Sequence, residues 1–281
     1  MKNPITSLAK RCTRVLMRSD GFWKLAQYLP GQSFFLQQRL PVVRKRAARE
    51  CAPLLNRLEV LSGPFAGMRY AESATVSCAL WPMLMGTYES ELRESLDSLS
   101  KNANYSRIVD VGFAEGFYLV GLGRMFEGAD LVGFDLNDDA KGLCEANASI
   151  NGIDQNRLKL HGGFDAETFR EELDDESLVV IDCEGFENDV IDSLEPEDFQ
   201  KADWLIETHD HLVDGTTERM TVAFRDTHDV VCLETDDDDR EKVGLLPDFV
   251  RQQHNQYIQE ALVAERRSAK QYWIVATRKA A

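Results

Sequence analysis

The segment IVDVGFAEGF, residues 108–117, decides the fold of this chain. A buried-strand pattern runs through it to Asp110, Gly112 and Gly116 flank a tight turn, and a helical pattern begins directly afterwards. A glycine turn lets the backbone approach a ligand closely, and the free N–H groups at a helix start favour polar or anionic groups. The segment therefore predicts a strand, a ligand-binding turn and a helix in succession.

Strand and helix patterns alternate along the chain from about residue 106 to residue 277. Alternating strands and helices form a mostly parallel sheet that is covered on both faces. We therefore predict an α/β fold with a Rossmann-like seven-stranded sheet, helices on both faces and an N-terminal helical extension. The expected strands are residues 106–112, 130–136, 157–161, 178–182, 204–208, 230–234 and 272–277, and the expected helices are residues 117–126, 138–150, 166–173, 188–194, 216–227 and 248–267.

The chain before this sheet divides into two further parts. Residues 58–72 predict a strand, a Gly-Pro turn and a second strand, and residues 92–99 predict a helix. The polar stretch at residues 101–104 indicates a domain boundary. The expected parts are a basic helical extension (1–57), a hairpin and helix that cap the site (58–100) and the main ligand-binding domain (101–281).

Charge is distributed unevenly along the 281 residues, whose formal net charge is −16. Residues 1–50 sum to +9, whereas the remaining 231 residues sum to −25. Such an acidic body repels nucleic acid, so we expect no nucleic-acid partner. No apolar run is long enough to cross a bilayer, and no secretory signal is visible. Six scattered cysteines fit reduced thiols, so we expect a cytoplasmic protein.

A basic amphipathic segment lies within residues 1–50, which predict a helical arm. Its apolar face could rest on the acidic body, or on an anionic membrane as a peripheral contact at the inner face. It could equally be a helical cap packed on the main domain or on a partner subunit, so a homo-oligomer stays open. The apolar face is formed by Ile5, Leu8, Cys12, Val15 and Leu16.

The glycine turn alone fits an NAD site, an S-adenosylmethionine (SAM) site or a structural turn. Asp135 ends the second strand about 20 residues further on, where a carboxylate can accept both ribose hydroxyls. Ala114 stands where a dinucleotide site usually has glycine. Glu115 would repel a diphosphate but tolerate a cationic sulfonium ligand. Together with the seven alternating strands, these features favour SAM.

Several motifs follow the predicted strands: DVGFAEG (110–116), GFDLN (133–137), VVIDCEGFE (179–187) and WLIETHD (204–210). Taken together they resemble the FkbM-type branch of class I SAM-dependent methyltransferases, and the third motif is the most specific. GPFAGM (63–68) and GTYESEL (86–92) also resemble the lead-in of this group. The resemblance covers about residues 60–280 and departs from the pattern at Ala114. The first 55 residues match nothing in it.

This resemblance implies SAM as the cofactor, a methyltransferase sheet with an antiparallel last strand, and O-methylation of a small-molecule, sugar or glycan-type acceptor. In such a protein the turn surrounds the methionine part of SAM, the acid after the second strand holds the ribose, and the loop after the third strand lies near the adenine. The cofactor-binding residues that follow are Asp110, Gly112, Glu115, Gly116, Asp135, Leu136, Gly163, Phe164, Asp165 and Asp182.

Methyl transfer to a hydroxyl needs an aligned acceptor and a nearby base. Asp182 and Glu184 follow the fourth strand, at the edge where open α/β sheets bind ligands. His209 could be the general base, or could hold a divalent cation with Asp182, Glu184 and Glu207. Asp182 could instead cap a helix, and His209 could lie in an ordinary loop. We predict catalytic roles for Asp182, Glu184 and His209 and assign no metal.

Two other functions stay open. A non-catalytic protein with this fold could act as a binding module or scaffold, although an intact set of Asp110, Gly112, Gly116 and Asp135 argues against it. An NAD-dependent oxidoreductase is disfavoured by Glu115 and by the absence of a Tyr-x-x-x-Lys pair in the second half of the chain.

Overall fold

A seven-stranded sheet organises the computed structural model of the chain. The structure describes residues 49–73, 79–235, 239–265, 267 and 269–279, together with residues 13, 15–26, 28, 30, 39, 42–43 and 45–46. The strands are β1 (Arg107–Val111), β2 (Asp130–Phe134), β3 (Leu158–His161), β4 (Ser177–Ile181), β5 (Ala202–Thr208), β6 (His228–Glu234) and β7 (Tyr272–Arg278).

The order of the strands is β3-β2-β1-β4-β5-β7-β6. β1 lies near the centre and pairs in parallel with β2 and β4, so that Val109 is in register with Val132 and with Val179. β3 and β5 extend the parallel part, whereas β7 runs antiparallel to both β5 and β6. This order confirms the predicted fold class and the antiparallel last strand. The strand order reverses between β1 and β4, which is where open α/β sheets bind ligands.

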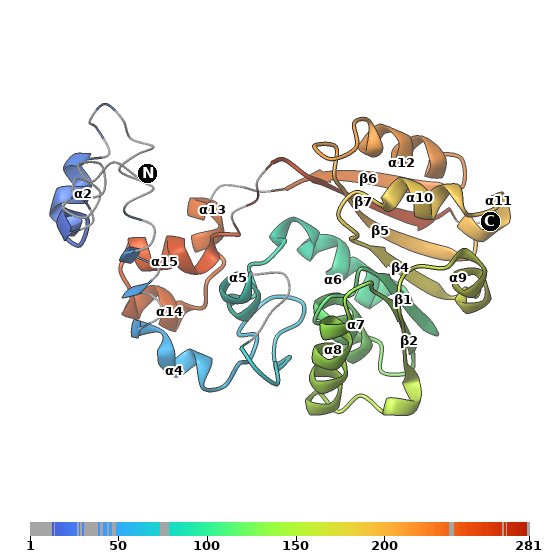
Figure 1. The fold of residues 1–281 in the computed structure, drawn as a ribbon, viewed down its shortest axis with the longest axis horizontal. Helices are drawn as coiled ribbons and strands as arrows, with labels where there is room; N and C mark the ends of the chain where they lie inside the picture. The colour runs from blue at the N-terminus through green and yellow to red at the C-terminus, as the bar shows by residue number, and fades with distance from the viewer. Residues whose placement is uncertain are drawn as a thin grey trace, which may run out of the picture.

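Two hydrophobic clusters, one on each face of the sheet, explain why helices cover both faces (Figure 1). Successive strand residues point to opposite faces, so Ile108 belongs to one cluster and Val109 to the other. The first cluster includes side chains of α6 (Arg93–Asn102), α7 (Phe117–Met125) and α8 (Asp138–Ile150), and the second includes side chains of α9 (Ala166–Glu172), α10 (Glu187–Asp192) and α12 (Thr216–Phe224), with α11 (Pro196–Phe199) packed against it.

Helix ends depend on caps, and one of them corrects the sequence analysis. α8 has the predicted bounds, and Asn137 caps it because its side chain accepts the Asp139 N–H at 3.0 Å. The single helix predicted for residues 248–267 is wrong, because the chain forms α14 (Asp248–Gln253) and α15 (Gln256–Val263) instead. Asn255 starts α15 by accepting the N–H groups of the second and third residues after it.

The hairpin predicted for residues 58–72 is formed without regular strands. Its arms share one antiparallel bridge, Glu59 with Arg69, and backbone hydrogen bonds such as that from the Val60 N–H to the Met68 carbonyl at 2.8 Å. Side-chain packing on α7 also holds the segment. The rings of Phe65 and Phe117 meet edge to face, with 5.1 Å between their centroids. Aromatic pairs of this geometry stabilise packing beyond the area that they bury.

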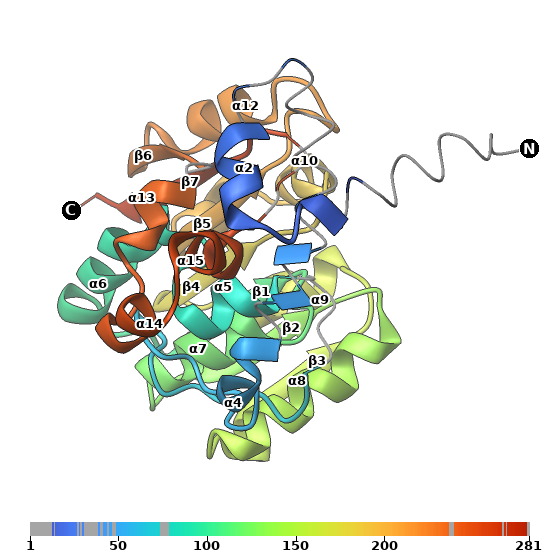
Figure 2. The ribbon, with the colours of Figure 1, turned by 90° about the vertical axis from the view of Figure 1, so that its left-hand side faces the viewer.

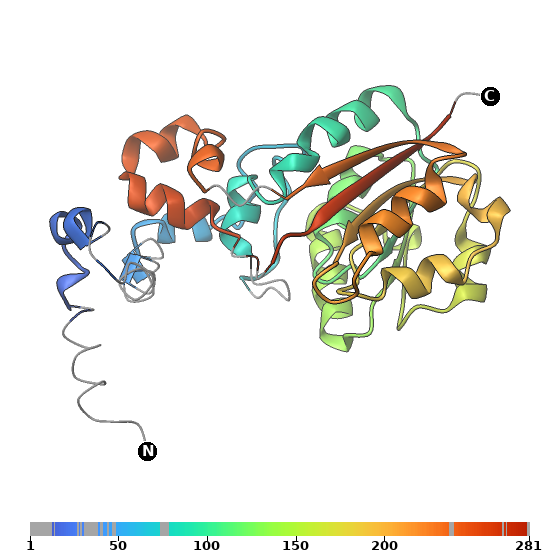
Figure 3. The same cartoon turned by 90° about the horizontal axis from the view of Figure 1, so that it is seen from above.

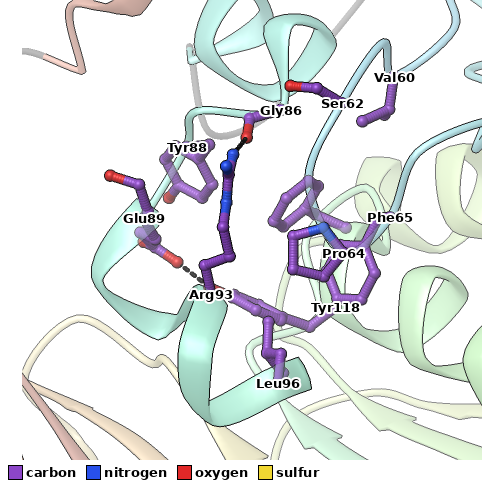
Figure 4. Close-up of a pocket in the computed structure, with 12 residues that line it drawn as sticks. Val60, Ser62, Pro64, Phe65, Gly86, Tyr88, Glu89, Arg93, Leu96 and Tyr118 are labelled. Atoms are coloured by element: carbon purple, nitrogen blue, oxygen red, sulfur yellow. Dashed lines mark hydrogen bonds between the residues drawn. The ribbon is translucent and has the colours of Figure 1, made fainter. Parts of the chain in front are cut away.

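The residues just before α6 are tied to the same region, as Figure 4 shows for a small cavity there. Arg93 donates to the Gly86 carbonyl at 2.8 Å, and Tyr118 on α7 donates to Glu89. Side chains from this lead-in and from the sheet belong to one hydrophobic cluster. The division at residues 57 and 100 stays a prediction.

Two described residues of the N-terminal part contact residues of α15 and of the end of α14, on the side of the molecule that faces the viewer in Figure 2 and lies at the left in Figure 3. Arg39 lies 4.9 Å from the ring centroid of Tyr257 on α15, and Cys51 Sγ lies 3.7 Å from His254 Nε2. These contacts favour a packed helical cap at Arg39 and Cys51. The other elements at this end are α2 (Asp20–Ala26), α4 (Ala52–Leu55), α5 (Leu80–Met85) and α13 (Asp239–Val243).

The amphipathic arm is described only in part. Ile5, Leu8 and Cys12 lie outside the described residues, whereas Val15 and Leu16 are exposed. Among the residues that the structure describes, none of the helices combines the length and apolarity needed to span a bilayer. The described cysteines, Cys51, Cys144, Cys183 and Cys232, are free thiols, and Cys78 lies outside the described residues.

Candidate active site

A cavity of about 560 Å³ lies at the carboxyl edge of the sheet. The ends of β1, β2, β4 and β5 contribute to it, because parallel strands end at one edge and the strand order switches there. Its volume is that of a small-molecule site. The predicted site residues that line it are Gly112, Asp135, Leu136, Gly163, Phe164, Asp182 and Glu184.

Gly112 must be glycine because β1 passes very close to β4 at this point. Its φ of 94° is left-handed, and a Cβ would lie 1.9 Å from the Asp182 carbonyl oxygen. The Gly112 N–H donates to the Phe134 carbonyl at 2.8 Å. The turn is thereby fixed between the ends of β2 and β4, with its backbone along the cavity wall.

Asp135 is held against the glycine turn by two backbone donors. Its Oδ2 accepts the Ala114 N–H at 2.8 Å, and its Oδ1 accepts the Asn137 N–H at 2.7 Å. Ala114 has a φ of 47°, a strained value for a residue with a Cβ, and such strain gathers at functional sites. A carboxylate has about four lone-pair positions, so Asp135 can still accept from two hydroxyls.

An apolar wall stands beside Asp135. Leu136 and Phe186 both line the cavity and both are exposed, Leu136 to 89 %. The Phe164 and Phe186 rings lie 6.3 Å apart, and Gly163 leaves room for Leu136. Large exposed apolar side chains within one concave site indicate a ligand with an apolar part that covers them.

Asp110 and Glu115 are buried and do not line the cavity. Burial, followed by the charge of Asp135, raises the pKa of Asp110 to about 8. Glu115 is also fully buried. Burial of Tyr70, followed by the charge of Glu115, raises the pKa of Tyr70. The turn directs both side chains into the protein, and the contact of these two acids with the cofactor stays a prediction.

Gly116 and Asp165 are also absent from the lining and serve helix starts. Gly116 precedes α7 with a φ of 85°, and a Cβ there would lie 2.7 Å from the Cys144 Sγ on α8. Asp165 is exposed, and its Oδ1 caps α9 by accepting the Thr168 N–H at 2.9 Å. That hydrogen bond lowers the pKa of Asp165. Both residues thus serve helix starts, and their contacts with the cofactor stay predictions.

Acidic side chains surround His209 at the end of β5. Its ring is fully buried, and its Nδ1 lies 2.7 Å from Glu187 Oε1. Its Nε2 lies 3.5 Å from Glu184 Oε2, 3.6 Å from Glu207 Oε2 and 3.8 Å from Asp182 Oδ1. The structure thus brings the three predicted catalytic residues together, with Glu184 77 % exposed and Asp182 25 % exposed at the cavity wall.

Three groups of this cluster, Asp182, Glu207 and His209, have raised pKa values. Burial and the charge of Glu89 raise the pKa of Asp182 to about 8. Burial and the charge of Asp182 likewise raise the pKa of Glu207 well above its usual range. Burial opposes protonation of His209, but its hydrogen bond with Glu187 and the charge of Glu207 raise its pKa. Shifts of this kind cluster at functional sites.

Arg267 is a cavity-lining residue that the sequence analysis missed. Its Nη2 lies 2.9 Å from Glu89 Oε1 and 3.1 Å from Glu265 Oε2, and its Nη1 donates to Glu207. Burial opposes its charge, but the surrounding acids, Glu89 first, raise the pKa of Arg267. No local motif marks Arg267, because two of its three partners, Glu89 and Glu207, come from segments far away in the sequence.

No protein-family model matches the chain, and no curated protein does. Solved structures with a similar fold include the precorrin-6y C5,15-methyltransferase of Geobacter metallireducens, with 12% identity over 66% of this chain and 89% of its own, and a TM-score of 0.42. An rRNA methylase of Streptococcus thermophilus has 14% identity over 67% and 96%, at 0.42. TrmK of M. capricolum, solved with S-adenosyl-homocysteine, has 13% identity over 66% and 67%, at 0.40. Scores this low carry no substrate or activity over to this chain.

Proposed function

We propose that this chain is a SAM-dependent methyltransferase of the FkbM-like type, which methylates an oxygen of a small-molecule, sugar or glycan-type acceptor. The observation that carries the proposal is the glycine turn at Gly112 beside Asp135, both lining one cavity with Asp182. The sequence motifs that resemble this group supply the acceptor class.

Four features of the cavity support this cofactor. Gly112 provides a backbone wall that any Cβ would disrupt, and Asp135 keeps lone pairs for ribose hydroxyls. Leu136 and Phe164 offer an apolar surface for a flat base. Asp182 and Glu184 make the far wall acidic, which suits a cationic ligand. When bound, SAM supplies an electrophilic methyl group on a positively charged sulphur.

The chain's own residues would then orient the acceptor and take its proton. Glu184 is the most exposed acid of the cluster and can reach a bound hydroxyl from the rim. Asp182 lines the same cavity and can help to orient that hydroxyl. Glu187 fixes the ring of His209, so His209 is held rigidly behind these two carboxylates.

Calorimetry with SAM, S-adenosylhomocysteine and NAD tests the proposal. We expect binding of the first two only. Asp135→Ala should weaken this binding by roughly 10- to 100-fold, which corresponds to the free energy of a hydrogen bond to a charged acceptor. Asp130→Ala, at the opposite end of β2, is the matched control and should leave affinity unchanged. Binding of NAD alone, or equal affinity in both variants, would contradict the proposed cofactor site.

The basic N-terminal arm, residues 1–50, stays a candidate for peripheral contact with an anionic membrane. Its net charge of +9 supports such a contact, since basic residues near an anionic surface add favourable energy. Sedimentation with anionic and neutral vesicles, for the full chain and a chain lacking residues 1–50, tests it. Equal sedimentation of the two chains would contradict the contact.

A further inference from the structure

His209 presents an unpartnered nitrogen to three carboxylates. Its ring is fully buried, yet Nε2 has no hydrogen-bond partner. The nearest oxygens of Glu184, Glu207 and Asp182 lie 3.5, 3.6 and 3.8 Å away, longer than ordinary hydrogen bonds. A buried polar atom without a partner is costly.

We propose that Asp182, Glu207 and His209 bind a divalent metal ion at the wall of the cavity. One ligand atom from each residue lies within 4.8 Å of the other two. Two ligand atoms that are each about 2.1 Å from a tetrahedral cation lie about 3.4 Å apart. The observed separations of 3.6 and 3.8 Å from Nε2 need only small adjustments of side chains to reach this geometry.

Glu187 is the positioning residue of this site. Its Oε1 lies 2.7 Å from His209 Nδ1 and accepts the Gly185 N–H at 2.9 Å. Metal-ligating histidines commonly donate their other ring N–H to a carboxylate, which fixes the tautomer and the ring orientation. With the proton on Nδ1, the lone pair of His209 Nε2 points at the space between Asp182 and Glu207.

The ligand set indicates the class of ion. One imidazole and two carboxylates suit Mn²⁺, Fe²⁺ or Zn²⁺ better than Ca²⁺, which takes oxygen ligands alone. Arg267 contacts the Oε1 atom of Glu207, whereas Oε2 faces His209, so one oxygen is left for the ion.

The role of the ion rests on the proposed function. Asp182 and Glu207 both line the cavity, so further coordination positions would open towards the acceptor. An ion there would hold two adjacent oxygens, which makes a vicinal diol or a hydroxy acid the acceptor class expected. Glu184, exposed on the rim, would remain free to accept the hydroxyl proton.

Manganese binding tests the site directly and without SAM. Full-length protein is freed of metal with a chelator and titrated with MnCl₂ in a calorimeter, and pulsed electron paramagnetic resonance records coupling of Mn²⁺ to a directly bonded nitrogen. We expect one bound Mn²⁺ with a nitrogen coupling. His209→Asn should remove that coupling, and Glu187→Gln should weaken binding by about 10- to 100-fold. Glu172→Gln, beside His161 at 3.6 Å, is the matched control and should bind as the wild type does.

Absence of saturable Mn²⁺ binding, or a nitrogen coupling that persists in His209→Asn, would overturn the site. Circular dichroism reports whether the variants fold. If His209→Asn does not fold, the Mn²⁺ affinity of Glu187→Gln decides whether the site exists. Binding of S-adenosylhomocysteine is measured in parallel on the metal-free protein. Binding of Mn²⁺ without binding of S-adenosylhomocysteine would contradict the proposed function and support the metal site. Binding of S-adenosylhomocysteine without binding of Mn²⁺ would support the proposed function and contradict the metal site.

Discussion

Asp110 shows at the residue scale how a buried acid makes stability depend on pH. Burial and Asp135 raise its pKa from 3.8 to about 8 in the folded protein. Between these two pKa values the unfolded chain has lost the proton that the folded chain keeps. The contribution of Asp110 to the free energy of unfolding is therefore full below about pH 4, and it is lost as the pH rises through about 8.

Asp110→Asn should therefore flatten this dependence. Urea unfolding of both proteins at pH 5 and pH 8 measures it. Between the two pH values we expect the wild type to lose more stability than the variant, by on the order of a few kcal/mol. Other buried acids such as Asp182 are common to both proteins and cancel in the comparison. A difference that is the same at both pH values would contradict the raised pKa.

At the scale of single elements, strand and helix ends decide which acids can touch a ligand. Asp135 and Asp165 both follow parallel strands, and the sequence analysis assigned both to the cofactor. The structure separates them, because Asp135 lines the cavity whereas Asp165 accepts the Thr168 N–H and caps α9. An aspartate at the same edge of the sheet can thus either face the cavity or cap a helix, depending on where the following helix begins.

Asp165→Ala should lower the melting temperature, because α9 loses its side-chain cap. Asp165→Asn should restore most of it, since asparagine caps equally well. Affinity for S-adenosylhomocysteine should stay within about twofold in both variants, a change of less than about 0.5 kcal/mol. Differential scanning calorimetry and titration calorimetry give the two quantities. A tenfold loss of affinity would restore Asp165 to the cofactor site.

At the scale of the whole molecule, Arg267 joins three distant parts of the chain. It contacts Glu89 before α6, Glu207 on β5 and Glu265 in its own segment, and its side chain is only 7 % exposed. A buried charge pair is weak evidence for net stability, but removal of one partner leaves uncompensated charge. Arg267 therefore matters chiefly because the buried acids around it would be destabilising without a cation.

Arg267→Met should destabilise the protein by about 3–5 kcal/mol, because two or more buried carboxylates lose their cation. Arg251→Met is the matched control, since Arg251 pairs with Asp248 on the surface, with 43 % and 77 % exposure. It should cost less than about 1 kcal/mol. Urea denaturation of the three proteins compares them, and similar losses in both variants would show that the Arg267 cluster is not energetically distinct.

Local sequence patterns were enough to predict the strands, the glycine turn and the acids that end β2 and β4. Apolar runs, glycine and alternation act over a few residues, and the sheet order then brings Gly112, Asp135 and Asp182 to one edge. The break between α14 and α15 was missed, although the cap at Asn255 is a local signal.

Only the tertiary structure decided which of these side chains face the cavity. Periodicity tells which positions are apolar, but the burial of Glu115 depends on the contacts of its turn with the rest of the fold. The same holds for Arg267, whose partners lie up to 178 residues away. Charge pairing and the free nitrogen of His209 arise from contacts between segments that folding brings together, and no local pattern encodes such contacts.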